Sequence, residues 1–238
     1  MRQLVSICMS AILLCAGSQP AMAEFPGKIQ AHYDVIGFDI KLAEISETFT
    51  RTEDNYQIES ITKAVGLLAR LKPETVRVIS QGKINTKGLV PLSYSLSRDV
   101  AAHKNTHATL NWETSMISLN DYKGLVERPL PQGTQDRLSV LYHLPHVSKS
   151  ADTEFKFSIT DGNSLDDYTY TLTPEETSVS VPLGAYKTRH IYGISTSTAV
   201  KYDIWMASEL DYFPCRIIVT DAKGGKLTQI LTHLTVTP

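Results

Sequence analysis

Three polar side chains of the types used in hydrolysis, Asp136, Ser139 and His143, lie close together in the chain. An acid, a nucleophilic hydroxyl and an imidazole base are the parts of a Ser-His-Asp triad, in which the acid must touch the base. The spacing excludes that contact, because on one helix with ~1.5 Å rise per residue, Asp136 and His143 are roughly 10 Å apart along the axis. The chain also has no G-x-S-x-G motif. No catalytic residue is therefore assigned, and we instead expect Asp136 at the start of a helix, paired with Arg137 or Arg216.

Two histidine pairs have spacings that can place imidazoles together on a helix: His103 with His107, and His143 with His146. The first pair lies in the polar segment AHKNTH, and the second straddles Pro145. No H-E-x-x-H motif or cysteine supplies a third ligand. We therefore expect no metal site and no cofactor, with the histidines exposed in turns.

Trp205 and Arg216 are the bulky residues on the otherwise polar sides of two predicted strands. Trp205 either packs under a helix or loop or lines a ligand cavity. Arg216 either pairs with an acid such as Asp136 or Asp203 or holds an anionic head group with its planar fork. With three side chains of the predicted helix added, the ligand-binding candidates are Trp205, Arg216, Asp136, Ser139 and Tyr142.

An alternation of apolar and polar residues with a period of two dominates the chain and predicts half-buried strands. It begins at Ile29 and Val35, and Gly37 then allows a hairpin turn into a second strand. In that strand the apolar phase moves from Leu42 to Ala43, which predicts a β-bulge and a curved sheet. Further strands are expected at 56–62, 75–81, 89–98, 108–114, 115–122, 154–160, 168–172, 178–183, 186–194, 200–207, 213–220 and 226–236.

Two segments are expected to be helical. Residues 135–144 form the main helix, with Thr134 as N-cap, Asp136 in the first turn and Pro145 ending it. Residues 64–71 form a short helix that ends before Pro73. Many short strands with few helices predict a mainly β fold, in which a strongly curved antiparallel sheet, half-open and barrel-like, wraps around the main helix.

The first 23 residues have the pattern of a secretory signal. Arg2 precedes the apolar run 4–16, and Ala21-Met22-Ala23 closes it as a cleavage site. The run is shorter than the roughly 20 residues that span a bilayer. We therefore expect cleavage after Ala23, no transmembrane anchor, a periplasmic location, and a single β-rich domain at 24–238.

The cysteine content and the net charge limit the chemistry and the partners that the mature protein can have. Cys8 and Cys15 fall in the signal, so Cys215 alone remains and is expected to be a small buried hydrophobe. A lipoprotein signal needs a small residue directly before its cysteine, but Leu14 precedes Cys15, so we do not expect a lipid anchor at Cys15. With 23 Lys and Arg against 25 Asp and Glu, and Arg2 the only charge in the signal, the mature chain has no basic excess. Nucleic acid is therefore not expected as a partner.

Several segments, taken in order and spacing, resemble a family of exported bacterial proteins, the domain of unknown function 3108. The resemblance covers most of the mature chain and implies a β-rich fold in which a bent sheet wraps a helix, similar to the half-barrels of lipoprotein localisation factors. Cys215 departs from the aliphatic residue usual at its position. The matching residues are Gly88-Leu89-Val90-Pro91, Tyr94, Pro131, Gln135-Asp136-Arg137-Leu138-Ser139, Tyr142, Thr160-Asp161-Gly162, Pro182-Leu183-Gly184, Tyr186, Lys187, Trp205, Tyr212-Phe213-Pro214, Arg216 and Gly224.

Three functions remain open on the sequence. The first is a non-catalytic binding or carrier module for an amphipathic, lipid-like component of the cell envelope, held between sheet and helix. The second is an envelope assembly or scaffold protein that binds another protein through its outer surface. The third is an enzyme acting on envelope glycans or lipids. The excess of apolar surface on sheet and helix, together with the fold analogy, favours the first.

Overall fold

The computed structural model describes residues 25–149 and 153–238, so the predicted signal peptide lies outside the described residues. Strands dominate, with two α-helices and two short 3-10 turns, and the mainly β prediction is confirmed. The elements are β1 (Lys28–Gly37), β2 (Ile40–Thr52), β3 (Asn55–Ala64), α1 (Gly66–Leu71), β4 (Thr75–Asn85), β5 (Gly88–Arg98), η1 (Ala102–Lys104), β6 (Thr106–Asn111), β7 (Met116–Asp121), β8 (Gly124–Pro129), β9 (Gln135–Asp136), α2 (Ser139–Val147), β10 (Glu154–Thr160), β11 (Leu165–Val181), β12 (Gly184–Ser195), β13 (Lys201–Ala207), η2 (Ser208–Leu210), β14 (Phe213–Thr220) and β15 (Lys226–Thr237).

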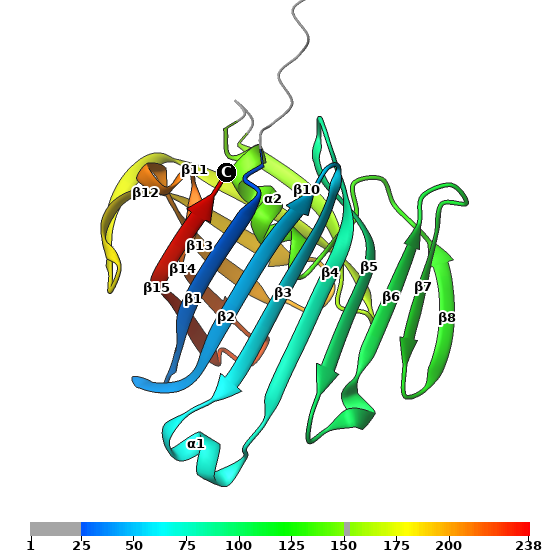
Figure 1. Ribbon diagram of the computed structural model, residues 1–238, viewed down its shortest axis with the longest axis horizontal. Coiled ribbons are helices and arrows are strands. Elements are labelled where there is room, and N and C mark those ends of the chain that lie inside the picture. Colours follow the sequence, from blue (N-terminus) through cyan, green and yellow to red (C-terminus); the bar gives the residue numbers. More distant parts are fainter. Residues whose placement is uncertain (1–24, 150–152) are drawn as a thin grey trace, which may run out of the picture.

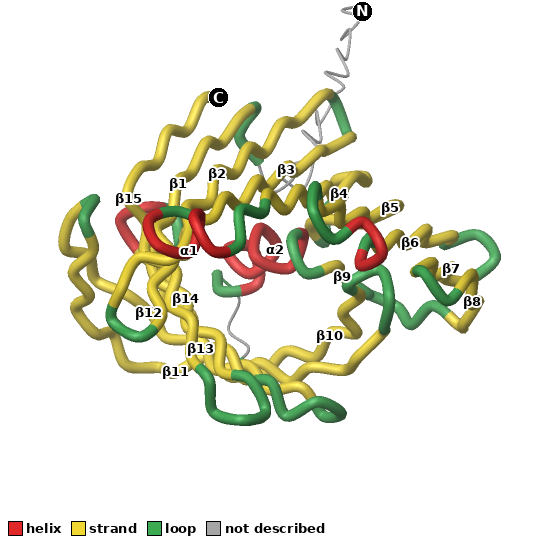
Figure 2. The backbone as a smooth tube through the Cα atoms, turned by 90° about the horizontal axis from the view of Figure 1, so that it is seen from below, coloured by secondary structure: helices red, strands yellow, loops and turns green. Residues whose placement is uncertain are grey.

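All fifteen described strands form one sheet, in the order β8-β7-β6-β5-β4-β3-β2-β1-β15-β14-β13-β12-β11-β10-β9. Neighbouring strands are antiparallel except for β9, which pairs with β10 in parallel. The sheet coils strongly, so that its two halves face each other (Figure 1). Seen from below, the strands run around α2 (Figure 2). The predicted curved sheet around one main helix is therefore confirmed.

The hairpin and bulge predicted near the start of the chain are both present. Gly37 pairs with Ile40 across a two-residue turn, and the β1–β2 register shifts at Val35, where Leu42 is the extra residue. Beyond the bulge, Ala43 and Ile45 are buried, which is the phase change that the sequence indicated.

The predicted start and end of the main helix are wrong. Residues Gln135 and Asp136 form β9 instead of a first turn, and α2 runs from Ser139 to Val147 with Pro145 inside it. The start is displaced because the backbone at Gln135 pairs with β10. Pro145 lacks only one N–H bond within the last turn, so the helix continues for two residues beyond it.

Two further differences have local causes. The predicted strands 168–172 and 178–183 are parts of the single strand β11, which ends at Val181. The strand continues past Pro174 because this residue lies in an irregular stretch between Leu172 and Glu176 that needs no ladder bond from its nitrogen. β8 was not predicted, because all six of its residues are exposed and it shows no one-sided alternation. The short helix α1 is confirmed within the predicted range. Neither helix in the described ranges is long and apolar enough to cross a membrane.

Contacts between the two halves of the sheet close the coil on one side. Gln135 in β9 donates from Nε2 to the carbonyl of Leu89 in β5 at 2.9 Å. Thr106 in β6 donates from Oγ1 to the carbonyl of Asp161, just after β10, at 2.7 Å. These bonds join segments far apart in the sequence and fix the distance between the halves around α2.

Candidate functional site

Asp136 fixes the start of α2. Its Oδ1 accepts hydrogen bonds from the backbone N–H groups of Leu138 (2.9 Å) and Ser139 (2.7 Å). In return, Ser139 Oγ lies 2.9 Å from the N–H of Asp136 and accepts its bond. This reciprocal arrangement satisfies donors that a helix start leaves unpaired. Asp136 and Ser139 are therefore brought together, but as a helix cap.

The second carboxylate oxygen of Asp136 ties α2 to the sheet. Oδ2 accepts a hydrogen bond from Ser80 Oγ in β4, and Ser80 in turn lies 3.1 Å from the hydroxyl of Tyr56. Burial raises the pKa of Asp136 to about 6, against the opposing effect of its hydrogen bonds. The expected ion pair with an arginine is wrong: among the described residues, Asp136 pairs with neither Arg137 nor Arg216.

Tyr142, one turn further along α2, reaches a second buried acid. Its hydroxyl donates to Glu47 Oε2 at 3.1 Å, and Ser60 Oγ donates to Glu47 Oε1 at 3.1 Å. Burial raises the pKa of Glu47 to about 7 although both hydrogen bonds oppose the shift. The ring of Tyr142 also stacks on Phe49, with centroids 5.6 Å apart. Tyr142 is thus an internal packing residue with a satisfied hydroxyl.

Trp205 and Arg216 lie on the other face of the sheet. Ile204 packs in the cluster that includes Val140 of α2, so its neighbour Trp205 points outward. The guanidinium of Arg216 lies over the Trp205 ring at 5.1 Å, and the ring of His190 is 4.8 Å from it. The structure therefore separates the five candidates into an inner group and an outer pair.

The ion pair expected between Arg216 and Asp203 is also wrong. Asp203 Oδ1 lies 2.9 Å from His190 Nε2 instead. Trp205 is half-buried against a cluster joined by Val181 and Tyr186 of the β11–β12 hairpin, so it packs under a neighbouring segment. The outer pair is held by stacking and by packing.

Arg137 stands between the two halves of the coiled sheet. Its Nη2 lies 3.2 Å from Asp161 Oδ2. Its backbone N–H donates to the carbonyl of Thr160 in β10 at 3.1 Å. Burial lowers the pKa of Arg137, but Coulombic interactions with Tyr202, Asp161, Tyr168 and Tyr94 outweigh this effect and raise the pKa overall. Even so, 49 % of its side chain is exposed. Solvent therefore reaches a cation on the inner side of the sheet.

Several apolar side chains on the inner face of the sheet are half-buried, whereas Leu138, Val140 and Leu144 at α2 are buried. The inner residues Val78 and Leu96 pack against the cluster that contains Tyr94, and Tyr202 and Val219 pack against the cluster that contains Ile204. All four have intermediate exposure. We call the inward-facing residues Arg137, Val78, Leu96, Tyr202 and Val219 the inner chamber. It offers apolar walls, tyrosine hydroxyls and one guanidinium.

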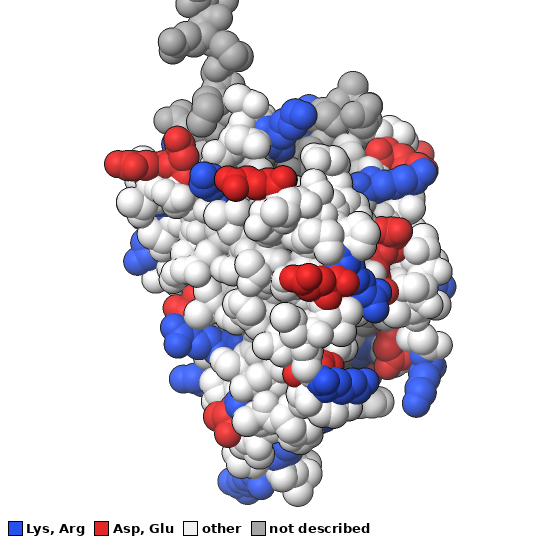
Figure 3. Space-filling view, turned by 90° about the vertical axis from the view of Figure 1, so that its right-hand side faces the viewer, with Lys and Arg blue, Asp and Glu red and all other residues white. Residues whose placement is uncertain are grey.

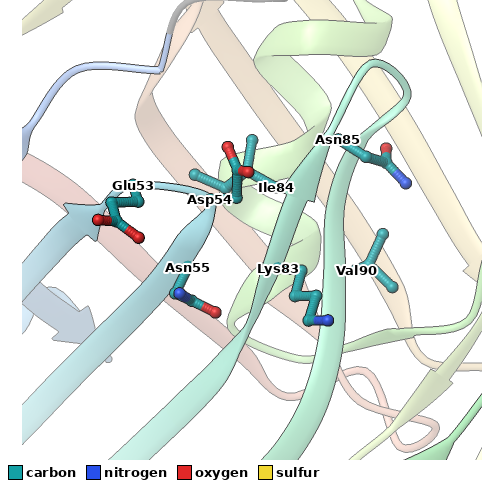
Figure 4. Close-up of a pocket in the computed structure, with 7 residues that line it drawn as sticks. All are labelled: Glu53, Asp54, Asn55, Lys83, Ile84, Asn85 and Val90. Atoms are coloured by element: carbon teal, nitrogen blue, oxygen red, sulfur yellow. The ribbon is translucent and has the colours of Figure 1, made fainter.

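A separate pocket of about 450 Å³ lies outside the sheet, at the β2–β3 and β4–β5 turns (Figure 4). Its polar side chains diverge: Glu53 and Lys83 point away from each other in Figure 4. Only Ile84 is buried, and Ile84 N donates to the carbonyl of Asp54 at 2.7 Å. The lining is charged and exposed, so it lacks the convergent groups of a specific site.

The remaining reactive side chains are held in inactive forms. The expectation of an exposed turn histidine is wrong for His143, which is buried in α2. Burial lowers the pKa of His143 to about 4, and its Nδ1 accepts the N–H of Leu89 at 3.3 Å, so the ring is neutral and bonded to the backbone. Burial raises the pKa of Cys215 to about 11, as expected for a buried hydrophobe. Across residues 25–149 and 153–238, no group of three His, Cys, Asp or Glu could hold a metal ion.

Sequence reasoning missed Glu47 and Arg137. Glu47 occupies the inward phase of β2, between Ile45 and Phe49, so its burial was visible in the alternation although its charge argued against it. Arg137 was considered only as a partner for Asp136. Its position follows from the pairing of β9 with β10, which no local pattern indicates.

Several motif segments meet at the closed side of the coil. The backbone of Leu89 contacts the side chains of both Gln135 and His143. Arg137 pairs with Asp161 in the turn after β10. Residues that are scattered in sequence thus form one contact region around the start of α2.

Comparison with solved structures finds a beta-barrel-like protein of the domain of unknown function DUF1849 from Brucella abortus. The match has a TM-score of 0.59 and 9 % sequence identity, and covers 88 % of this chain and 97 % of that one. At this identity the likeness shows the fold alone. Comparison with curated proteins gives no match. The family model described as a protein of unknown function, DUF3108, matches residues 28–232, so the chain belongs to the DUF3108 family.

Proposed function

We propose that this protein is a non-catalytic binding or carrier module of the periplasm that holds an amphipathic envelope molecule in the inner chamber. In this proposal residues 1–23 are removed on export. Arg137 binds the anionic head of the ligand, a carboxylate or a phosphate, with donors that its contact to Asp161 leaves free. The chain of the ligand lies along Val78, Leu96 and Val219.

The observation that carries the proposal is the half-exposed guanidinium of Arg137 on the inner side of the sheet. A charge there costs desolvation energy, which a purely packed interior avoids by using apolar residues. Tyr94, Tyr168 and Tyr202, on β5, β11 and β13, add bulk and hydroxyl groups nearby. A cation beside apolar walls suits a ligand with an acidic end and a hydrocarbon end.

An enzymatic role has less support. Ser139 and Asp136 are engaged with each other at the helix start and His143 with the backbone of β5, so these three side chains do not form a nucleophile and base pair. The carboxyl groups of Glu47 and Asp136 are buried behind Tyr142 and Ser80. They hold the helix in the sheet.

Arg137→Leu is expected to weaken binding of 11-(dansylamino)undecanoic acid about tenfold, because a charge-assisted hydrogen bond to the carboxylate is lost. The methyl ester of the same probe lacks that charge, so its affinity should change less than about twofold. Fluorescence titration measures both. Arg77→Leu is the matched control, since Arg77 also pairs with an acid, Glu59, but lies exposed on the outer face. Equal affinities of wild type and Arg137→Leu for the acid would remove the assigned role of Arg137.

A further inference from the structure

The β1–β2 turn and α1 lie at the lower end of the molecule in Figure 1, and both carry exposed large apolar side chains. Phe38 in the β1–β2 turn is 92 % exposed, and Leu67 and Leu71 of α1 are 64 % and 75 % exposed. Ile40 and Leu227 are also exposed. We call these five residues the lower rim. Grouped exposed apolar residues are uncommon on a free surface and mark interaction sites.

The residues of the lower rim are neighbours in space. α1 contacts β2, and the N–H of Val65, just before α1, bonds to the carbonyl of Leu42 at 2.9 Å. The side chain of Leu227 lies against Gly37 at the base of the Phe38 turn. The rim therefore runs without a break from β15 across the β1–β2 turn to α1.

The two residues of the turn that carries Phe38 are not those that stabilise its backbone conformation best. Phe38 and Asp39 have φ values of 53° and 59°, the left-handed backbone of a type I′ turn. Asn-Gly suits that backbone, while a bulky residue there is strained. A phenylalanine that strains the turn and contacts almost nothing contributes little to stability, so its side chain points to a partner outside the fold.

Basic residues accompany the rim. Arg70 and Lys72 flank Leu71, and Lys223 and Lys226 lie in the turn before Leu227. Asp39 is exposed, and Asp221, in the turn before Leu227, accepts bonds from backbone N–H groups of its own turn. Asp34 and Glu44 are both paired with Lys41, and Glu74 is paired with Arg98. Figure 3 shows Lys and Arg atoms among uncharged surface at the lower tip. This local basic excess contrasts with the net charge of −2 of the whole chain.

We propose that the lower rim docks on the surface of an anionic lipid bilayer. Phe38, Leu67 and Leu71 enter the boundary between head groups and acyl chains, and Arg70 and Lys72 contact lipid phosphates. Apolar residues ringed by cations match a lipid surface, which offers hydrocarbon below a layer of negative charge. The lower rim shares no residue with the inner chamber, so docking does not depend on whether the chamber binds a ligand.

Co-sedimentation with vesicles tests the docking. Wild-type protein should bind vesicles of phosphatidylethanolamine and phosphatidylglycerol at 3:1, and bind phosphatidylcholine vesicles at least tenfold more weakly, with binding that falls as salt rises. The double substitution Phe38→Asn, Asp39→Gly should raise the melting temperature, because it supplies the preferred turn, and should lower binding to the anionic vesicles at least tenfold. A loss of binding therefore cannot come from a loss of folding.

Two controls separate docking from other causes. All variants share the same N-terminal segment, so any vesicle binding by that segment is the same in each. Leu125 is an exposed apolar residue on the distant strand β8, and Leu125→Asn should bind vesicles as wild type does. Arg137→Leu should also dock normally, so a chamber that binds nothing leaves this test intact. Unchanged binding by the Phe38→Asn, Asp39→Gly variant would overturn the proposal, as would a rim-dependent dimer that binds no vesicles.

Discussion

Asp136→Ala is expected to lower the free energy of unfolding by about 3 kcal/mol, because it removes a buried hydrogen-bond acceptor at the start of α2. The substitution removes the acceptor for the N–H groups of Leu138 and Ser139 and for the hydroxyl of Ser80. All three donors lie in the buried interior, where an unpaired donor costs about 1 to 3 kcal/mol. Urea unfolding at pH 5 measures the change, since a pKa of about 6 keeps most of Asp136 protonated there.

Asp136→Asn tests whether the stability loss in Asp136→Ala comes from the lost hydrogen bonds at the helix start or from the lost side-chain volume. The amide keeps an oxygen at the position of Oδ1, so the loss at pH 5 should stay below about 1 kcal/mol. Equal losses for alanine and asparagine would show that the cap does not hold α2 in place, and would contradict the bonding described for the helix start.

Glu47→Gln is expected to make the protein more stable than wild type at pH 8 by about 3 kcal/mol and to leave it nearly unchanged at pH 4.5. The pKa of Glu47 is about 7 in the folded protein against an ordinary value of 4.5. Between these values the folded state keeps a proton that the unfolded state has lost. Wild-type stability therefore falls as pH rises through this window, and the glutamine variant lacks that fall.

Unfolding curves for both proteins across pH 4 to 8 test this. Their difference isolates Glu47, because Asp136 and His143, which also titrate in this range, are present in both. Glu44→Gln is the control: Glu44 lies on the same strand but faces solvent beside Lys41, so its effect should stay within about 0.5 kcal/mol. A difference between wild type and Glu47→Gln that does not grow with pH would refute the buried ionisation.

The sheet could be predicted from sequence because its signal is local. Inward residues such as Ala43, Ile45 and Phe49 alternate with polar ones, and the alternation gives both the strands and the bulge. β8 was not predicted because both of its faces are exposed, and an edge strand without a buried face shows no alternation of apolar and polar residues. β11 was divided because proline normally ends a strand, whereas Pro174 sits in an irregularity of the ladder.

The site was less predictable because it depends on contacts between distant segments. Asp136 was recognised as a helix-start residue, but its bond to Ser80 crosses 56 positions. Arg137 acquires its surroundings from β5, β11 and β13 together. Trp205 and Arg216 were grouped with the helix residues because each is bulky on a polar side of a strand, yet that side faces outward. Only the direction of coiling decides which face becomes the interior.

Mass spectrometry of the protein purified gently from cells, in its intact state and after organic extraction, tests directly whether the inner chamber holds a ligand. We expect one equivalent of an amphipathic anion in wild-type protein, retained in Arg77→Leu and reduced at least fivefold in Arg137→Leu. Protein that is empty in every preparation, and whose interior also takes up no dansyl-undecanoic acid, would contradict the claim that the inner chamber is a binding site.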